Sequence, residues 1–423
     1  MLDFKPSSVI LYNYQEKFSS INYNNLKIEK GAKMKVAGII AEYNPFHNGH
    51  ALLAQKAREA GATHVVAVMS GNFVQRGEPA IMHHSVRTRA ALESGVDLVL
   101  QLPSVYAVSS AQSFARAGAE ILDGTGCIDW LVFGSECGST EMIAEAAELV
   151  YSDEIKPLIT AELEKGITFA AARENALRKI NPGFADIIQS PNNILGVEYA
   201  AALKKIGSKI SPVTFARVGA EHDSKEASGS IASASMIREA VKSGGNFADF
   251  VPEKAAELYS DAALSDIKLI ENAILYKMKT TTAQALSLAP DVSEGIENRI
   301  VSAAKEAKSL DGLYSIAKTK RYTHARIRRI IMNHFLCVTA ADLALPVPYI
   351  RVTGFNEKGA ELIRMMKNTA NLPVITKAAD IPQAGENAQR IFSLECTVGE
   401  IFSLCMPENA RNAAEKSFRP III

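Results

Sequence analysis

The segment Glu42–His50 carries the side chains best suited to chemistry, and it reads Glu-Tyr-Asn-Pro-Phe-His-Asn-Gly-His. It follows an apolar run and opens a helix-like stretch, which is where parallel sheets bind their ligands. His47 and His50 are three residues apart, so on a helix their imidazoles share one face. Both rings can donate hydrogen bonds to a triphosphate and follow the charge that develops at its α-phosphate. Gly49 and the free N–H groups of the helix start would let the backbone approach phosphate.

Two other interpretations of the histidine pair stay open. Such a pair could bind zinc, although no His-Glu-x-x-His pattern and no evident third ligand accompany it. The pair could also be purely structural. The sequence contains neither a P-loop nor a complete Gly-x-Gly-x-x-Gly segment, so P-loop and dinucleotide-binding proteins lack support. No metal site is indicated, and whether Mg²⁺ accompanies a nucleotide is left open.

A second candidate element is Ser230–Arg238, which places small hydroxyl residues at a helix start and an arginine one turn further on. Ser233, Ser235 and Arg238 could together bind phosphate through N–H, O–H and guanidinium donors. The alternative is an ordinary serine N-cap. Partnership with the histidine motif favours phosphate binding.

The elements that must position these residues alternate between strand and helix from Met34 to about Gly245. The expected strands are 36–42, 64–69, 96–102, 130–134 and 213–218, and the expected helices are 49–60, 87–94, 111–122, 141–180, 193–206 and 234–242. This order predicts an α/β fold with a Rossmann-like parallel sheet covered by helices on both faces. Beyond residue 250 a helical pattern to about 338 precedes strands 348–355 and 373–376 and helices 360–367 and 388–404. We therefore expect a mainly helical α+β C-terminal region.

The amino-acid composition excludes several classes of protein. Lys plus Arg equals Asp plus Glu at 46 each, so a uniformly basic nucleic-acid coat is excluded but a local basic patch is not. The 48% hydrophobic content excludes bulk disorder. The five cysteines contain no Cys-x-x-Cys pair and indicate reduced thiols. No apolar run is long enough for a membrane span and no signal peptide is evident, so we expect a cytoplasmic protein without membrane contact.

One local basic cluster does occur, and no acid interrupts it. Its cations are Lys318, Lys320, Arg321, Arg326, Arg328 and Arg329. It suits contacts to a phosphate backbone, and the interleaved Tyr322 could stack on an unpaired base. The alternative is a solvated helix face whose acidic partners lie elsewhere in the fold.

From Met34 onward the sequence resembles the tRNA(Met) cytidine acetate ligases, members of the nucleotidyltransferase superfamily with a His-x-Gly-His signature. The matching stretches are residues 38–50, 69–79, 132–136, 190–196 and 318–329. The first two are far more specific than the bare signature, and the resemblance spans almost everything except residues 1–33. One departure is His84-Ser85, where the family pattern leads us to expect Lys-Trp.

The resemblance implies an ATP-dependent RNA-modifying ligase. ATP and acetate would form acetyl-adenylate, and the acetyl group would pass to N4 of the wobble cytidine of elongator tRNA(Met), forming N4-acetylcytidine. His47 and His50 would be the catalytic residues. The implied ATP-binding residues are Ile40, Ala41, Glu42, Tyr43, Asn44, Pro45, Phe46, His47, Asn48, Gly49, His50, Ala51, Leu52, Leu53, Gly134, Asn192, Asn193 and Arg217, joined by Ser233, Ser235 and Arg238 of the second element. Of the two asparagines we prefer Asn192.

The resemblance also divides the chain. Residues 34–250 would form the nucleotidyltransferase-like ATP-binding domain, and residues 251–423 a C-terminal domain that contributes to tRNA binding. The implied tRNA-binding residues are Lys318, Lys320, Arg321, Tyr322, Arg326, Arg328 and Arg329. Residues 1–33 lack periodicity, so we expect an N-terminal extension, a mis-chosen start, or a short ordered arm. Oligomeric state is left open.

A polar loop follows the second strand. Its residues Asn72, Gln75, Arg76 and Glu78 would contact the target base or acetate, or else form a solvated turn.

Two other functions stay open: a small-molecule adenylyltransferase and a catalytically silent nucleotide- or RNA-binding module. The long region after residue 250 argues against the first, which needs only one compact α/β domain. The intact histidine pair argues against the second.

Overall fold

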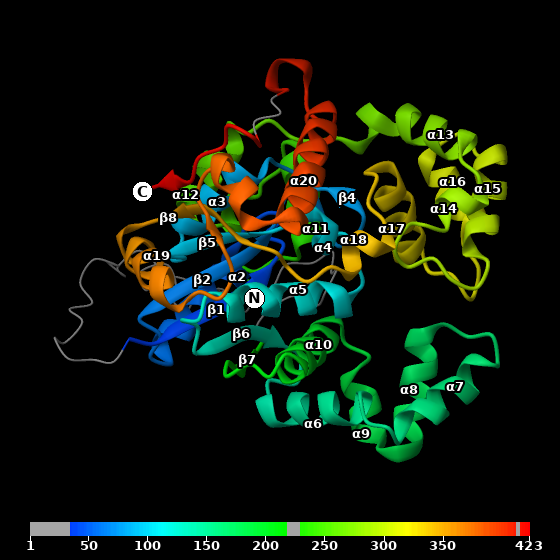
Figure 1. Ribbon diagram of the computed structural model, residues 1–423, viewed down its shortest axis with the longest axis horizontal. Helices are drawn as coiled ribbons and strands as arrows, with labels where there is room; N and C mark the ends of the chain where they lie inside the picture. The colour runs from blue at the N-terminus through cyan, green and yellow to red at the C-terminus, as the bar shows by residue number, and fades with distance from the viewer. Residues whose placement is uncertain (1–33, 218–228, 412–414) are drawn as a thin grey trace, which may run out of the picture. The chain divides into compact units, whose positions relative to one another are not determined.

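The computed structural model describes residues 34–217, 229–411 and 415–423. The expectations for residues 1–33 therefore lie outside the described residues. Most of the described chain is built around one eight-stranded sheet with the order β10-β8-β5-β2-β1-β6-β7, with β9 also paired to β8 (Figure 1). The sheet strands are β1 Val36–Ala41, β2 His64–Ser70, β5 Leu98–Leu102, β6 Trp130–Ser135, β7 Ser211–Ala216, β8 Ile350–Phe355, β9 Val374–Ile375 and β10 Ile421–Ile422.

Strands β1, β2, β5, β6 and β7 all run parallel, which confirms the predicted Rossmann-like sheet. The helices between them are α2 Asn48–Glu59, α3 His84–Leu92, α4 Ser104–Ala107, α5 Ala111–Gly124, α6 Thr140–Val150, α7 Ile155–Leu163, α8 Phe169–Ile180, α9 Pro182–Ile187 and α10 Pro191–Lys205, and α11 Ala234–Ser243 follows β7. The helical stretch expected at 141–180 is three helices, and the break between α7 and α8 follows from Gly166, which adopts a positive φ of 74°, and from Thr168, which caps the new helix.

The C-terminal region is mainly helical with added strands, as predicted. Its helices are α12 Glu253–Ser260, α13 Glu271–Thr280, α14 Ala283–Leu286, α15 Ile296–Glu306, α16 Leu310–Ala317, α17 His324–Phe335, α18 Ala340–Ala344, α19 Glu357–Thr369 and α20 Glu386–Leu404. Its strand β8 pairs antiparallel with β5, and β10 pairs parallel with β8. The sheet thus takes strands from both sides of residue 250. This pairing covers the backbone edge that β5 would otherwise expose.

Alternate residues of β1 face opposite layers of helices. Ala37 and Ile39 belong to a buried cluster that also contains residues of α2, α3, α11 and α12. On the other face, a Cβ at Gly38 would lie 2.7 Å from a methyl carbon of Leu122, so glycine is what lets α5 pack against the strand. Helix α5 contacts α10 on this face (Figure 1). Burial on both faces explains why β1 is a continuous apolar run.

The winding of the sheet creates the crevice in which a ligand can bind. The chain passes from β1 through β2 to β5 and then returns to the other side of β1, where it forms β6 and β7. The carboxyl ends of β1 and β6 therefore lie at a topological switch point, the usual ligand position in open α/β sheets. Among the described residues, no helix combines the length and apolar character needed to span a bilayer.

Candidate active site

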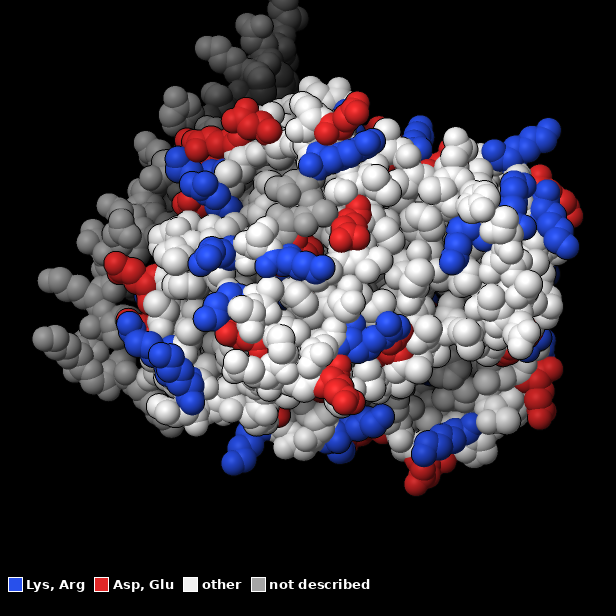
Figure 2. Space-filling model, turned by 45° about the horizontal axis from the view of Figure 1, so that its top comes forward, with Lys and Arg blue, Asp and Glu red and all other residues white. Residues whose placement is uncertain are grey.

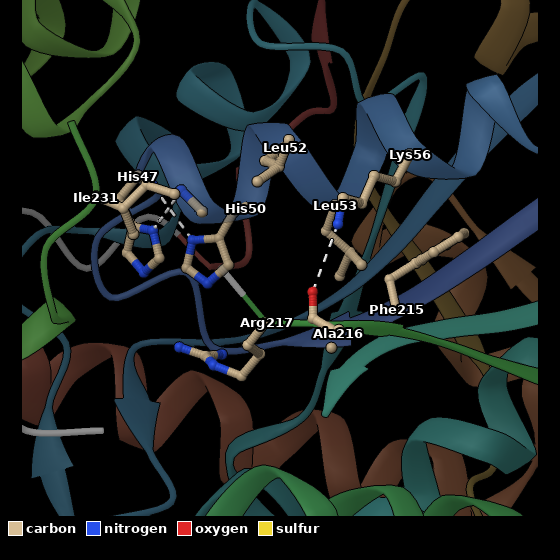
Figure 3. Close-up of a pocket in the computed structure, with 11 residues that line it drawn as sticks. His47, His50, Leu52, Leu53, Lys56, Phe215, Ala216, Arg217 and Ile231 are labelled. Atoms are coloured by element: carbon tan, nitrogen blue, oxygen red, sulfur yellow. Dashed lines mark hydrogen bonds between the residues drawn. The ribbon is translucent and has the colours of Figure 1, made fainter. Parts of the chain in front are cut away.

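A cavity of about 370 Å³ lies at this switch point. That volume is within the usual range for small-molecule sites. Most of the predicted nucleotide-binding residues line it, namely Ile40, Ala41, Glu42, Tyr43, Asn44, His47, His50, Leu53, Gly134, Asn192, Arg217, Ser233, Ser235 and Arg238. A smaller pocket that shares the two histidines adds Gly49 and Leu52 (Figure 3). Segments far apart in the sequence thus meet at one sheet edge.

The two imidazoles are fixed by their own helix start. His47 is the N-cap of α2, and its Nδ1 accepts from the Gly49 N–H at 3.1 Å. His50 Nδ1 accepts from the His47 N–H at 3.2 Å, which completes a reciprocal capping box. The rings stack with centroids 3.7 Å apart. Because each Nδ1 is an acceptor, a neutral ring must carry its proton on Nε2. Both Nε2–H groups are then donors, and Figure 3 shows the rings on the side of α2 that faces Arg217.

The environment keeps both rings neutral. Burial, with the nearby Arg217 and Arg238, lowers the pKa of His47 to about 3. Burial, His47 and Arg217 also hold the pKa of His50 well below its ordinary value. The pair therefore offers neutral N–H donors at physiological pH, and the positive charge of the site comes from arginine.

This neutrality predicts a pH profile. We expect no loss of acetate-dependent ATP–pyrophosphate exchange from protonation of His47 between about pH 5.5 and 8. Since the ordinary pKa is 6.5 and the folded value is lower, acidification below 6.5 protonates the unfolded chain preferentially, and stability declines there. The measurement is exchange rate against pH for the wild type and His47→Asn. An acid limb near pH 6.5 that disappears in the variant would contradict the prediction.

The serine–arginine element meets the histidine motif directly. Ser233 is the N-cap of α11, and its hydroxyl accepts from the Met236 N–H. One turn further on, Arg238 donates to the Asn44 carbonyl at 2.9 Å. Asn48 donates to the carbonyls of Ser230 and Asp249. Ser233 is therefore an ordinary N-cap, and the helix that it caps also lies beside the histidine motif.

The two asparagines at the start of α10 differ in their partners. Asn193 is buried; its Oδ1 accepts from the N–H groups of Glu136 and Cys137, and its Nδ2 donates to Ile187. Its polar atoms are used within the protein. Asn192 lines the cavity, and its Oδ1 accepts from Arg217 at 3.3 Å. Its Nδ2 donates to Glu136 Oε1 at 2.6 Å, so both asparagines have protein partners, and the preference for Asn192 stays a prediction that rests on its place at the cavity wall.

Several predicted nucleotide-binding residues do not line either pocket: Pro45, Phe46, Asn48, Ala51 and Asn193. Phe46 is fully buried in the hydrophobic core, where the Tyr259 hydroxyl donates to its carbonyl. Asn48 and Asn193 are engaged as described above. These residues shape the loop without lining either pocket, and their part in binding ATP stays a prediction.

Arg87 is a residue of the site that sequence reasoning missed. Its side chain is fully buried in α3. The guanidinium donates to the carbonyls of Met82 and Glu42, and to those of Ser70 and Gly71 at the end of β2. It therefore ties together the loops that follow β1 and β2. An arginine in a short helical pattern carries no local sign of such a role.

The basic cluster is largely neutralised inside the fold. Arg326 and Arg329 bond the 291–294 segment, with Arg329 Nε 2.8 Å from the Asp291 carboxylate. Arg321 pairs with Glu294 at 3.3 Å, and Arg328 with Glu78 at 2.7 Å. These acids lie far from the cluster in sequence, so the cluster looked unpaired there.

Tyr322 is also placed differently from the expectation. It is only 8% exposed, and its hydroxyl donates to the Glu294 carbonyl at 2.6 Å. The ring is therefore not available to stack on a base. Lys318 and Lys320 are exposed and have no ion pair among the described residues. On the face drawn in Figure 2, cationic and anionic side chains are interspersed, with no field of a single sign.

We expect the two exposed lysines to contribute most to RNA affinity. Lys318→Glu with Lys320→Glu should weaken tRNA binding about tenfold and reduce its salt dependence, because phosphate contacts are lost. The control is Lys205→Glu with Lys209→Glu near the start of β7, which changes net charge equally. Filter binding at several salt concentrations measures both. Equal losses in the two variants would show a net-charge effect and contradict the prediction.

Comparison with known proteins decides the family. A family model described as HIGH Nucleotidyl Transferase matches residues 34–417. The tRNA(Met) cytidine acetate ligase of Thermoanaerobacter sp. (strain X514) is 38% identical over 403 residues, which cover 92% of this chain and 100% of the relative. The chain belongs to the tRNA(Met) cytidine acetate ligase family. A relative of the same name from Caldanaerobacter subterraneus subsp. tengcongensis is 39% identical over 407 residues, again with 92% and 100% coverage.

Solved structures of the family agree with the fold. The apo crystal structure of Thermotoga maritima TmcAL superposes with a TM-score of 0.88 at 31% identity. The match covers 92% of this chain and 100% of the Thermotoga chain. A crystal structure of the same protein bound with alpha-thio ATP gives a TM-score of 0.86 at 30% identity with the same coverage. The resemblance inferred from the sequence motifs is therefore confirmed.

The described residues contain only one group of side chains that could together bind a metal ion, namely His83, His84 and Glu415. Their candidate ligand atoms lie within 4.8 Å of one another. The group lies outside the cavity, at the position where the sequence departs from the expected Lys-Trp pair. Glu415 already accepts from Arg351 at 2.7 Å and from Asn72 at 3.1 Å. The cluster thus attaches the C-terminal segment to the start of α3.

Proposed function

We propose that this protein activates acetate with ATP and transfers the acetyl group to N4 of the wobble cytidine of elongator tRNA(Met), forming N4-acetylcytidine. The observation that carries the proposal is the pair of neutral imidazoles with Nε2–H donors at the switch point of the sheet. Family membership supplies the substrate class. A tRNA substrate also supports a cytoplasmic location.

The first step suits the geometry of the cavity. An acetate oxygen attacks the α-phosphorus of ATP, the bond to the β-phosphate oxygen breaks, and pyrophosphate leaves. Negative charge grows on the phosphate oxygens during this step. The Nε2–H groups of His47 and His50 and the guanidinium groups of Arg217 and Arg238 are fixed donors that can stabilise it. Such a step needs positioning and charge stabilisation rather than covalent catalysis.

The second step uses the activated acetyl group. The cytosine N4 amine attacks the acetyl carbonyl carbon, and the bond to the AMP oxygen breaks. Free acetate could not serve, because its leaving group would be oxide. AMP already supplies the leaving group, so the proposed transfer needs no covalent acyl carrier, and the described residues that line the cavity include no cysteine.

We further propose a division of labour along the chain. Residues 34–250 contribute the ATP cavity, while the region from 251 to 423 contributes tRNA contacts through the exposed part of the basic cluster. The salt bridge between Glu78 and Arg328 supports proximity of the two, because it joins the loop after β2 to α17. This arrangement would place an RNA bound near α17 within reach of the sheet edge.

One assay separates this function from its alternatives. Labelled acetate, ATP and transcribed elongator tRNA(Met) are incubated with the protein, and label in RNA and release of pyrophosphate are both measured. Label in RNA supports the ligase. Acetate-dependent pyrophosphate release without RNA labelling would indicate an adenylyltransferase with another acceptor. No ATP turnover would indicate a silent binding module and overturn the proposal.

A further inference from the structure

Glu42 and Gln75 come together where the cavity meets the hairpin of β3 Phe73–Val74 and β4 Glu78–Pro79. Both residues line the cavity. The Gln75 backbone N–H donates to Glu42 Oε1 at 2.9 Å, so the hairpin turn holds the carboxylate in place. Arg87 fixes the backbone of the same residue by donating to the Glu42 carbonyl at 2.8 Å. The two side chains are thus prearranged at one wall.

The Gln75 side chain has an unused donor. Its Nε2 is buried and has no hydrogen-bond partner. A buried donor without an acceptor is rare in folded proteins, and at a cavity wall it points to an acceptor on a ligand. The phosphates already have the donors at the histidine end of the cavity. The amide therefore suits a different part of the reacting molecules.

Glu42 has the opposite character. It is the only carboxylate among the described residues that line the cavity, where the other charged side chains are arginines. A carboxylate repels phosphate and instead suits a ligand group that donates hydrogen bonds. Burial raises the pKa of Glu42 above its ordinary value, against the Gln75 N–H and the charges of Arg238, Arg76 and Arg87. The carboxylate is consequently a better proton acceptor than an exposed one.

We propose that Glu42 and Gln75 bind the Watson–Crick edge of the target cytosine, with the carboxylate accepting from the N4 amine and the amide donating to N3. This inference rests on the proposed function and deepens it. Cytosine offers a donor at N4 beside an acceptor at N3, which matches the pair. Uracil presents an acceptor at O4 and a donor at N3, so both contacts would be repulsive. The pair thus explains the choice of base.

The same contact assigns a proton acceptor to the transfer step. N4 attacks the acetyl carbonyl carbon and a C–N bond forms. The N4 proton moves to the Glu42 carboxylate, the C–O bond to the phosphate breaks, and AMP leaves with the electron pair. Cytosine N4 is a weak nucleophile because its lone pair is delocalised into the ring. Removal of its proton as the bond forms is therefore where a general base has its effect.

The other side of the hairpin contacts α17, which indicates from which direction the target base would enter the cavity. A Cβ at Gly77 would lie 2.9 Å from backbone atoms of Arg328 and Arg329, so the turn rests on α17. Glu78 adds its ion pair with Arg328. The hairpin therefore contacts the basic helix on one side and the cavity on the other. A base from RNA bound along α17 would pass over this hairpin.

The test compares the two half-reactions in Glu42→Gln and Gln75→Ala. Acetate-dependent ATP–pyrophosphate exchange measures adenylation without RNA. Enzyme preincubated with ATP and labelled acetate, then mixed with saturating tRNA, measures transfer in a single turnover. For Glu42→Gln we expect the ratio of the transfer rate to the adenylation rate to fall by about 10²-fold. Equal losses in both half-reactions would overturn the proposal, because they would assign Glu42 to ATP or to folding.

Gln75→Ala is judged by base discrimination. A transcript with uridine in place of the wobble cytidine competes with the normal transcript for binding. We expect the wild type to prefer cytidine and the variant to lose about fivefold or more of that preference. An unchanged preference would contradict the assignment. A change in overall fold would alter affinity for both transcripts alike.

Glu59→Gln is the control, because it removes an exposed carboxylate at the end of α2 that lines neither pocket and contacts neither the hairpin nor α17. At saturating tRNA its ratio of transfer to adenylation should match the wild type. Wild-type protein that fails to label RNA would refute the proposed function itself. Wild-type labelling together with an unchanged ratio in Glu42→Gln would refute only the present inference.

Discussion

Replacement of His50 by alanine is expected to reduce acetate-dependent ATP–pyrophosphate exchange by about 10²–10³-fold. The His50 Nδ1 is occupied by the His47 N–H, so the group lost to the ligand is the Nε2–H donor. In the proposed first step that donor faces the phosphate oxygens on which negative charge grows. Binding of tRNA should persist, because His50 lies at the sheet edge and not on α17. A variant that lost RNA binding and kept adenylation would contradict the assignment.

Two conservative variants identify the nitrogen that matters. Glutamine places an amide near the position of Nε2, whereas asparagine places its polar atoms near Nδ1. We expect His50→Gln to retain more exchange activity than His50→Asn. The reverse order would mean that the helix cap, and not the donor to phosphate, is the essential contact. His334→Ala serves as the control, since that half-buried ring contacts Thr281 away from the cavity.

Arg87→Met should produce the largest loss of stability, with the free energy of unfolding reduced by about 3 kcal/mol or more. The methionine fills much of the space but leaves the carbonyls of Met82, Ser70 and Gly71 in the interior, and the half-buried carbonyl of Glu42, without this donor. Each unsatisfied buried acceptor is costly. Because these carbonyls lie in the loops after β1 and β2, pyrophosphate exchange should fall as well. Denaturant unfolding and the exchange assay measure the two effects.

Arg89 provides a matched control two residues along the same helix. Its side chain is 55% exposed and approaches Glu93 at 3.6 Å, a geometry that contributes little to stability. Arg89→Met should therefore change the free energy of unfolding by less than about 0.5 kcal/mol. Similar losses in the two variants would show that the helix, and not the buried guanidinium, is responsible.

Elements with local sequence signals were predicted correctly, whereas an element that depends on a contact with a distant segment was not. Strand β1 and helix α2 were predicted because their signals are local. The strand is a continuous apolar run, and the two histidines that follow it are spaced to share one face of a helix. The capping box of His47 and His50 is equally local, since its hydrogen bonds span three residues. Strand β10 was missed because two residues at the end of the chain carry no pattern, and their partner is β8.

The same distinction between local and long-range contacts applies to the residues of the candidate site. The chain's own pattern determined that the His-x-Gly-His motif follows the first strand of a parallel sheet, because the β–α junction itself creates the N–H donors of the helix start. Only the tertiary structure decided that Gln75 meets Glu42, that Arg87 is buried beneath both loops, and that Asp291 neutralises Arg329. Contacts between distant segments depend on how helices and strands pack together, and no spacing along the chain encodes which charges then become neighbours.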